Sequence, residues 1–366
     1  MDTQPSNTTT NDTAVPSVLT SALAPMQGAY QPIPETGSEN HYKSAVRLAE
    51  TKTMPREEWL EMRKQGIGAS EAAAAVGLNP YQSPLELWMI KTGRDTHFPK
   101  DDPNDDTSPM FWGNVLEKIV AKHYSHKTGN KVRRVNAVLQ HPDTDKPWML
   151  ANLDYAVSGN DDVQILECKT AGEWGAKLWK DGVPEYVQCQ VQHQLAVTGK
   201  QAADVCVLIC GQRVEIFRIE RDEELIDRLI TLERQFWRYV ESDTPPPTDG
   251  SDSAGKALGY LYPHDKGETV DFTGDVELCE QFDALVSARD EIAYLSKHET
   301  KLKQEIQARM GGATKAAFIN GTVSWKRSKD TEVLDTQSLL AEQPVLMELY
   351  AKTRKGSRRF TIQVTQ

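Results

Sequence analysis

A short apolar stretch of the chain ends in two opposite charges. Residues 163–169 read VQILECK, so Glu167 and Lys169 flank Cys168. Side chains on a β-strand alternate between two faces, so in a strand Glu167 and Lys169 share the face of Ile165. That face begins apolar and ends with an acid and a base. The simplest interpretation of such a pair is a solvated salt bridge.

A second acid lies across a predicted hairpin from this stretch. Two strand-like segments, 148–157 and 163–169, are separated by turn-forming residues. With a two-residue turn between them, Asp154 lies opposite Glu167, whereas a turn one residue longer breaks this register. Like charges directly opposite one another destabilise a sheet, unless a cation lies between them or one acid is protonated.

Two carboxylates beside a lysine are the groups that a divalent-metal phosphodiesterase needs. Mg²⁺ prefers oxygen ligands and is usually held by one or two carboxylates together with substrate phosphate. Such a metal polarises the phosphoryl group and lowers the pKa of bound water, while Lys169 would stabilise developing negative charge. Glu117, one turn after Gly113 in a predicted helix over 109–128, would supply a third carboxylate.

The elements that position these residues follow from periodicity and capping signals. Helices are predicted over 59–64, 83–93, 109–128, 185–198 and 222–240, and strands over 131–140, 148–157, 163–169, 204–209 and 213–220. Ser83 and Ser70 are placed as N-caps of the helices that follow them. The helix over 109–128 is expected to bury a stripe formed by Val115, Leu116, Ile119, Val120 and Tyr124. Helices before and after a strand cluster indicate a layered α/β domain.

The composition indicates a globular protein. Its 366 residues, of which 39% are hydrophobic, suffice for one large domain or two smaller ones. No stretch approaches the roughly 18 apolar residues of a membrane helix, and no export signal is recognisable, so we expect a cytoplasmic protein. Five cysteines without CxxC spacing argue against a disulfide framework or a zinc site. The net charge of −11 argues mildly against a uniformly basic DNA-binding surface.

Composition shifts divide the chain. The predicted organisation is a disordered tail over 1–40, a main domain over 41–241, a linker over 242–268 and a C-terminal accessory domain over 269–366. In the last of these, apolar residues at 278, 282, 285, 292, 295, 302 and 306 predict a long amphipathic helix or a helical hairpin. Asn320-Gly321 predicts a β-hairpin, and RRFTIQV predicts a closing strand.

Five sequence blocks, in order, resemble a known family. They are RKQGIGASEAAAAVGLNPYQSPLELW, WGNVLEK, ANLDYAVSG, ILECKT and YVQCQVQHQLAVTG. From about Trp59 to Val240 the chain is similar to YqaJ-type viral recombinases and lambda exonuclease-like alkaline nucleases of the PD-(D/E)xK superfamily. One D…ExK pattern is weak, because many unrelated proteins match it, whereas five ordered blocks are specific. The resemblance implies a three-layer, restriction-endonuclease-like α/β core with a mixed central sheet flanked by helices, followed here by a C-terminal helical and β-hairpin region.

The resemblance also implies roles for single residues. The implied metal ligands are Asp154, Glu167, Glu117 and the backbone carbonyl of Cys168, and the implied catalytic residues include Lys169 and Gln190. From the residues alone, Gln190 is equally a member of an ordinary polar helix face.

A second group of residues is implied to hold the 5′-phosphate of a DNA end. Arg63 and Ser70 flank the glycine-containing loop, and Gln192 is a further DNA-binding candidate. Glycines at 66 and 68 would allow close backbone approach there. Without the family, a plain helix cap explains Ser70. His193 is expected to make a hydrogen bond rather than to bind metal.

The implied activity is that of a Mg²⁺-dependent deoxyribonuclease, with Mn²⁺ able to substitute. It would degrade one strand of linear double-stranded DNA in the 5′–3′ direction and leave 3′ overhangs for a single-strand annealing protein. The family further implies a ring-shaped homo-oligomer and a phage or prophage origin, in the cytoplasm of a bacterial host. Two alternatives stay open, a related DNA endonuclease and a non-catalytic DNA-binding recombination scaffold.

Overall fold

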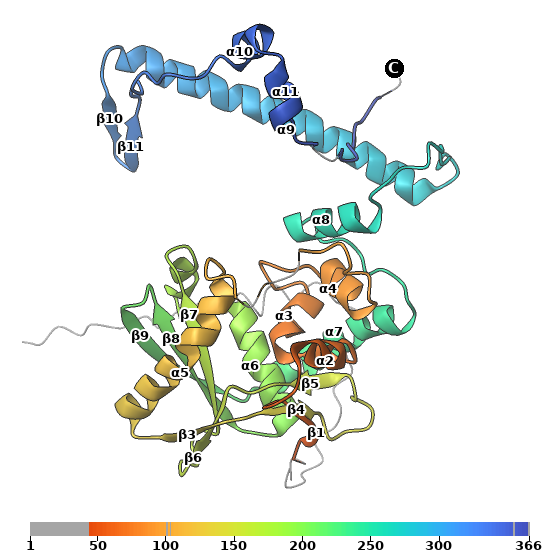
Figure 1. Cartoon of the computed structure of the whole chain (residues 1–366), viewed down its shortest axis with the longest axis vertical. Helices are drawn as coiled ribbons and strands as arrows, with labels where there is room; N and C mark the ends of the chain where they lie inside the picture. The colour runs from red at the N-terminus through yellow and green to blue at the C-terminus, as the bar shows by residue number, and fades with distance from the viewer. Residues whose placement is uncertain (1–43, 100–101, 103, 354–355, 365–366) are drawn as a thin grey trace, which may run out of the picture. The chain divides into compact units, whose positions relative to one another are not determined.

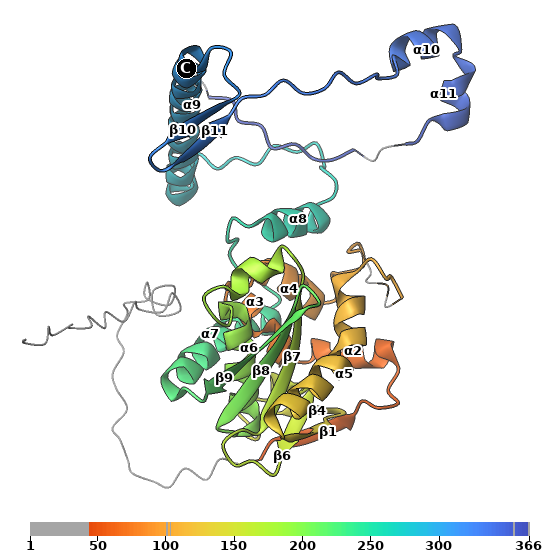
Figure 2. The same ribbon diagram turned by 90° about the vertical axis from the view of Figure 1, so that its left-hand side faces the viewer.

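The computed structural model describes residues 44–99, 102, 104–353 and 356–364. The chain divides into two compact units, one up to Tyr262 and one from Pro263 onward. Figures 1 and 2 draw both units as ribbons. The tail predicted to be disordered, residues 1–40, lies outside the described residues. In the described part of the chain, no helix is long and apolar enough to cross a membrane.

A five-stranded mixed sheet forms the centre of the first unit. Its strand order is β3 (Lys131–Arg134), β6 (Tyr155–Ser158), β7 (Ile165–Ala171), β8 (Ala202–Ile209) and β9 (Arg213–Glu220). Strands β7 and β8 are parallel, and the other neighbours are antiparallel. The predicted hairpin register is confirmed, because Tyr155 pairs with Leu166. Asp154 therefore lies at the end of this ladder, on the side of Glu167.

Two long predicted strands break and pass from one sheet to another. The segment 131–140 becomes β3 and β4 (Ala137–Gln140), and the segment 148–157 becomes β5 (Met149–Ala151) and β6. Strands β4 and β5 belong to a four-stranded sheet with β1 (Val46–Glu50) and β2 (Ile67–Gly68). At the break, the N–H of Val135 donates to the carbonyl of Asp154 at 3.1 Å. Asp154 is thus held at a corner between the two sheets.

Helices cover both faces of the five-stranded sheet, which confirms the predicted three-layer α/β architecture (Figure 2). Helix α5 (Pro109–Thr128) lies on one face, where Val120 and Leu166 share an apolar cluster. Helix α6 (Glu185–Thr198) lies on the other, where Val191 and Ile165 share a second cluster. Helix α7 (Glu223–Glu241) packs against α6. The predicted alternation of β7 side chains between the two faces of the sheet is confirmed, because Ile165 and Leu166 belong to the clusters on opposite faces.

The apolar stripe predicted for α5 is only partly correct. Val120 and Tyr124 are buried, but Val115 and Ile119 are exposed. A side chain at Gly113 would lie 3.9 Å from the hydroxyl of Thr170 in β7, an ordinary contact distance, so this turn of α5 lies against the sheet. Because residues one helical turn apart share a face, Glu117 also faces β7.

Part of the predicted linker is a helix. Residues 252–261 form α8, which is capped by Ser251 and packs on α4 (Pro84–Lys91). The hydroxyl of Ser253 donates to Glu86 at 2.6 Å. The first compact unit therefore extends to Tyr262, beyond the predicted boundary at residue 241. Ser83 caps α4 as predicted, because its side chain accepts from the N–H of Glu86.

The second unit contains one long helix rather than a helical hairpin. Helix α9 (Val276–Met310) is followed by a hairpin of β10 (Lys315–Phe318) and β11 (Gly321–Ser324), which confirms the hairpin prediction. Two short helices, α10 (Thr336–Glu342) and α11 (Val345–Tyr350), follow. The strand predicted for RRFTIQV is wrong, since residues 358–364 form no strand in the structure.

A buried pair ties α6, α7 and β5 together. Nδ1 of His193 lies 2.7 Å from Glu233, and Nε2 lies 3.0 Å from the carbonyl oxygen of Leu150. The hydrogen bonding expected of His193 is confirmed. Burial opposes the charged imidazole, but the Glu233 carboxylate outweighs it and raises the pKa of His193. Both side chains of the pair are fully buried.

We predict that Glu233→Leu lowers the free energy of unfolding by about 3–5 kcal/mol, because it leaves the fully buried His193 without its carboxylate partner. Because the pKa of His193 is raised, the loss is full below pH ~6.5 and shrinks as the pH rises through the folded-state pKa. Urea unfolding at several pH values measures both effects. Glu224→Leu, which breaks an exposed pair with Arg228 on the same helix, is the control and costs at most about 1 kcal/mol. Equal losses in the two variants would contradict the prediction.

Candidate active site

One cavity brings together nearly all residues singled out from the sequence. It has a volume of about 450 Å³ and lies between α2 (Arg56–Lys64), α5, α6 and β7. Its lining includes Arg63, Ser70, Glu117, Asp154, Glu167, Cys168, Lys169 and Gln190. Gln192 does not line it.

Glu167, Lys169 and Gln190 form a closed triangle. The ammonium of Lys169 lies 2.8 Å from Oε1 of Glu167 and donates to Oε1 of Gln190 at 2.8 Å. The amide of Gln190 donates in turn to Oε1 of Glu167 at 2.6 Å. The acid and the base share a face of β7, and the amide reaches them from α6. Glu167 is buried and the Lys169 side chain is 25% exposed, so the pair is a partly buried three-way contact rather than a solvated salt bridge.

Gln194, which the sequence analysis missed, is the second amide at Glu167. Its side chain donates to Oε2 of Glu167 at 2.8 Å. Residues four apart on a helix share a face, so Gln190 and Gln194 reach the same carboxylate, whereas Gln192 points elsewhere. Gln192 donates to the carbonyl of Glu220 instead. Helical spacing within the QVQHQ block was the signal that could have identified Gln194.

Asp154 is held by the backbone beside Glu167. Its Oδ2 accepts from the N–H of Cys168 at 2.9 Å. Burial and the nearby charge of Glu167 raise the pKa of Asp154 to about 8, although the charge of Lys169 acts in the opposite sense. Burial alone lowers the pKa of Lys169, but the charges of Glu167 and Asp154 outweigh it and raise that pKa. The site thus holds a charged ammonium beside two carboxyl groups.

Glu117 reaches the cavity from α5 with one oxygen engaged. Its Oε2 pairs with Arg134 at 3.2 Å. Its Oε1 is buried and has no hydrogen-bond partner among the described residues. A buried oxygen of this kind costs free energy unless a cation or donor meets it.

The donor set has the chemistry of a site for a hard divalent cation, but the ligands are not preassembled. All three acids offer oxygen, and added positive charge would lower the pKa of Asp154 and satisfy Glu117. In the part of the chain that the structure describes, however, no three acidic, histidine or cysteine side chains stand close enough to form a ready metal-binding group. The expected convergence of three carboxylates on one point is thus not present in this arrangement.

Arg63 and Ser70 meet at the rim of the same cavity. The guanidinium of Arg63 donates to the hydroxyl of Ser70 at 3.0 Å and lies 4.8 Å from the ring centre of Trp59. Ser70 is not the predicted helix cap, because it lies within a short 3-10 turn, Ala69–Glu71, ahead of α3 (Ala72–Ala75). Gly66 is required by the chain's own packing, since a side chain there would lie 2.5 Å from the carbonyl oxygen of Trp148, and the predicted approach of phosphate to this loop stays a prediction.

A buried acid that the sequence analysis missed positions Arg63. Glu71 pairs with Arg63 at 2.7 Å and with Lys91 at 2.6 Å. Burial raises the pKa of Glu71, but Arg63 and Lys91 outweigh it and the net pKa is lowered. Lys91 also donates to the backbone carbonyl of Arg63 at 2.7 Å. An acid at the start of an Ala-rich buried segment was the only sequence signal for this network.

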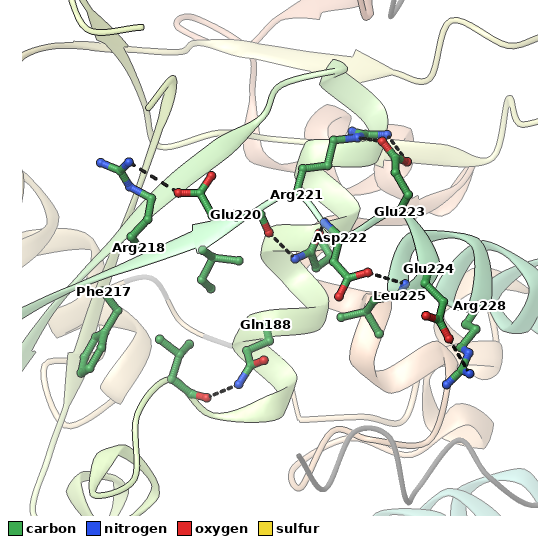
Figure 3. A pocket seen from close by; sticks show the side chains of 13 residues that line it. Gln188, Phe217, Arg218, Glu220, Arg221, Asp222, Glu223, Glu224, Leu225 and Arg228 are labelled. Carbon is green, nitrogen blue, oxygen red and sulfur yellow. Dashed lines mark hydrogen bonds and ion pairs between the residues drawn. The ribbon is translucent and has the colours of Figure 1, made fainter. Parts of the chain in front are cut away.

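A larger cavity lies elsewhere, beside the start of α7, and has a volume of about 770 Å³ (Figure 3). Arg218, Arg221 and Arg228 line it, and each pairs with a glutamate of the same cavity. Gln192 lies here, as an anchor of the turn between β9 and α7. This cavity contains none of the residues that the sequence pattern assigned to chemistry, apart from Gln192.

The sequence matches known proteins across this site. The model of the YqaJ-like viral recombinase domain matches residues 58–201. Protein YqaJ of Bacillus subtilis (strain 168) is 34% identical over 327 residues, which cover 87% of this chain and 98% of that protein. The chain belongs to the YqaJ-like family. The match to YqaJ extends beyond the first unit, because that unit ends at Tyr262. Recombinases act on DNA, so DNA is the substrate class that the YqaJ-like family implies.

Solved structures also resemble part of this YqaJ-like protein. An alkaline exonuclease (LHK-Exo) from Laribacter hongkongensis is 25% identical, with a TM-score of 0.42 over 51% of this chain and 93% of that chain. A phage-related exonuclease from Haemophilus somnus 129PT is 13% identical, with a TM-score of 0.34 over 49% and 96%. Both TM-scores are below 0.5.

We predict that the wild-type protein loses stability as the pH rises toward 8 and that the Asp154→Asn variant does not. An acid whose pKa is raised to about 8 binds a proton in the folded state that the unfolded state releases, so stability falls as the pH rises toward 8. The slope is at most about 1.4 kcal/mol per pH unit for one proton. Urea unfolding in EDTA measures it. The control, Asp143→Asn, changes an acid whose pKa is lowered and keeps the wild-type slope.

Proposed function

We propose that this protein is a metal-dependent DNA exonuclease that degrades linear duplex from 5′ ends and leaves 3′ overhangs for an annealing partner. The observation that carries the proposal is the cavity in which Asp154, Glu167, Glu117 and Lys169 lie beside Arg63. Membership of a recombinase family supports DNA as the substrate.

In this proposal, Asp154, Glu167 and Glu117 would hold Mg²⁺ or Mn²⁺, together with the carbonyl of Cys168. The bound metal would supply a polarised phosphoryl oxygen and a water of lowered pKa. Lys169 keeps its ammonium charge beside the scissile phosphate and stabilises the negative charge that develops there. Gln190 holds the ammonium in place through its side-chain oxygen.

Arg63 is the residue that we propose binds the 5′-phosphate. A guanidinium matches phosphate oxygens in geometry and charge, and Ser70 adds a hydroxyl beside it. Glu71 and Trp59 already restrain the Arg63 side chain, so little side-chain freedom is lost when phosphate binds. A terminal phosphate held at this rim would present the adjoining strand to the carboxylates.

We predict that Lys169→Ala lowers the rate of nucleotide release at least 100-fold, because the charge that stabilises the transition state is lost. The measurement is digestion of end-labelled linear duplex in Mg²⁺ or Mn²⁺, with EDTA abolishing wild-type activity. Lys122→Ala, on the exposed face of α5 and outside the cavity, is the control and keeps wild-type rates.

Other results of this assay would count against the proposal. Retained activity in Lys169→Ala would show that the role assigned to Lys169 is wrong. Cleavage of covalently closed duplex would indicate an endonuclease. DNA binding without nucleotide release by the wild type, at any metal concentration, would indicate a non-catalytic scaffold.

We predict that Arg63→Ala removes the preference for a 5′-phosphate over a 5′-hydroxyl end. Rates on hydroxyl ends change little, while rates on phosphorylated ends fall by about 10–100-fold, the loss expected for a charge-assisted contact of about 1.5–3 kcal/mol. Arg94→Ala is a matched control, because Arg94 also stacks on a tryptophan, Trp88, and pairs with an acid, Asp243. An equal decrease in the digestion rate of both kinds of end would contradict the proposed binding of the 5′-phosphate by Arg63.

A further inference from the structure

Helix α9 carries an apolar surface that the rest of the second unit leaves largely uncovered. Among the described residues of α9, Met310 alone is buried. Ile292 and Leu295, near the middle, are 63% and 53% exposed. In proteins, most helical stability comes from packing of an apolar face. An uncovered surface along 35 helical residues therefore indicates an interaction site.

The apolar residues of α9 repeat every seven positions. With Leu278 at position a of a heptad, the a positions are Leu278, Leu285, Ile292, Glu299 and Ile306, and the d positions are Gln281, Ala288, Leu295, Leu302 and Arg309. We call these ten residues the α9 seam. Only Gln281, Glu299 and Arg309 are polar. A seven-residue repeat sustained over this length is typical of a left-handed coiled coil.

The polar members of the seam distinguish between two ways of pairing with a second copy. In a parallel pair, equal positions face one another, so Glu299 would meet Glu299 and Arg309 would meet Arg309. Like charges inside a seam are costly. A parallel pair of α9 helices is therefore disfavoured.

An antiparallel pair avoids both clashes in a single register. There Leu285 faces Leu302 of the second copy, and Ile292 faces its Leu295. Glu299 faces Ala288 of the second copy, which leaves space for the carboxylate to reach water. Arg309 faces Leu278 at the open end of the seam. In this register every a residue faces a d residue along the whole of α9.

We propose that α9 joins two copies of this chain through an antiparallel coiled coil centred between Ala293 and Tyr294. A cavity of about 440 Å³ beside the α9 seam supports a second copy of the chain as the partner that covers the seam. Leu302, Ile306 and Phe318 line it, between the end of α9 and the β10–β11 hairpin. In the antiparallel register this cavity lies beside the first turns of α9 of the second copy, where Val276 and Phe282 are exposed. The inference does not depend on the proposed nuclease activity.

Disulfide trapping tests the register. In a full-length background with the exposed Cys210 and Cys279 replaced by serine, Leu285→Cys and Leu302→Cys chains with different tags are co-expressed and mildly oxidised. The antiparallel register gives one disulfide between unlike chains and none when either variant is oxidised alone. Homodimeric disulfides of each variant alone would indicate a parallel pair and overturn the proposal. The absence of a cross-link in every combination would also overturn the proposal.

A charge placed in the seam tests the association itself. Leu295→Lys is expected to halve the molar mass of the full-length assembly in light scattering. Tyr294→Lys is the matched control, because Tyr294 is the neighbouring residue, is 70% exposed and lies outside the seam, and it leaves the mass unchanged. Circular dichroism checks that both variants keep the helix. Equal masses for wild type and Leu295→Lys would mean that α9 contacts its own chain or nothing, and would overturn the proposal.

Discussion

Two side-chain amides of α6 hold the buried carboxylate of Glu167, and the geometry of the candidate site depends on this contact. Gln190 donates to one oxygen and Gln194 to the other, and Lys169 adds a charge-assisted bond. A buried carboxylate oxygen without a donor costs free energy, so these three contacts stabilise the position of the Glu167 side chain. Because Gln190 also accepts from Lys169, one helix face sets the positions of both the acid and the base.

Local periodicity was enough to predict the elements that carry the site. The helices over 109–128 and 185–198 and the strand over 213–220 have the predicted bounds, because capping residues and alternation mark their ends. The shared face of Glu167 and Lys169 follows from the two-residue period of a strand. The break of the segment 131–140 between two sheets was not predictable, since no glycine or proline marks it and only tertiary pairing decides it.

The sequence predicted which residues line the candidate site better than it predicted the contacts that they make. Spacing identified the acids, but it carries no information about the donor that each acid meets. Those donors come from different elements, namely a backbone N–H for Asp154, two amides for Glu167 and Arg134 for Glu117. The acids consequently line one cavity without converging as a ready ligand set. Glu71 was missed for the same reason, since its partner Lys91 lies on another helix.

The corner at Asp154 limits where the chain can change in length. Two neighbouring segments cross there between the sheets, and each is anchored by strand pairing on both sides. An insertion in either crossing would shift the strand beyond it by one place and turn its side chains to the opposite face. Extra residues in the turns at 142–145 and 159–162, which lie outside the strands, would by contrast leave both crossings and their strand pairing unchanged.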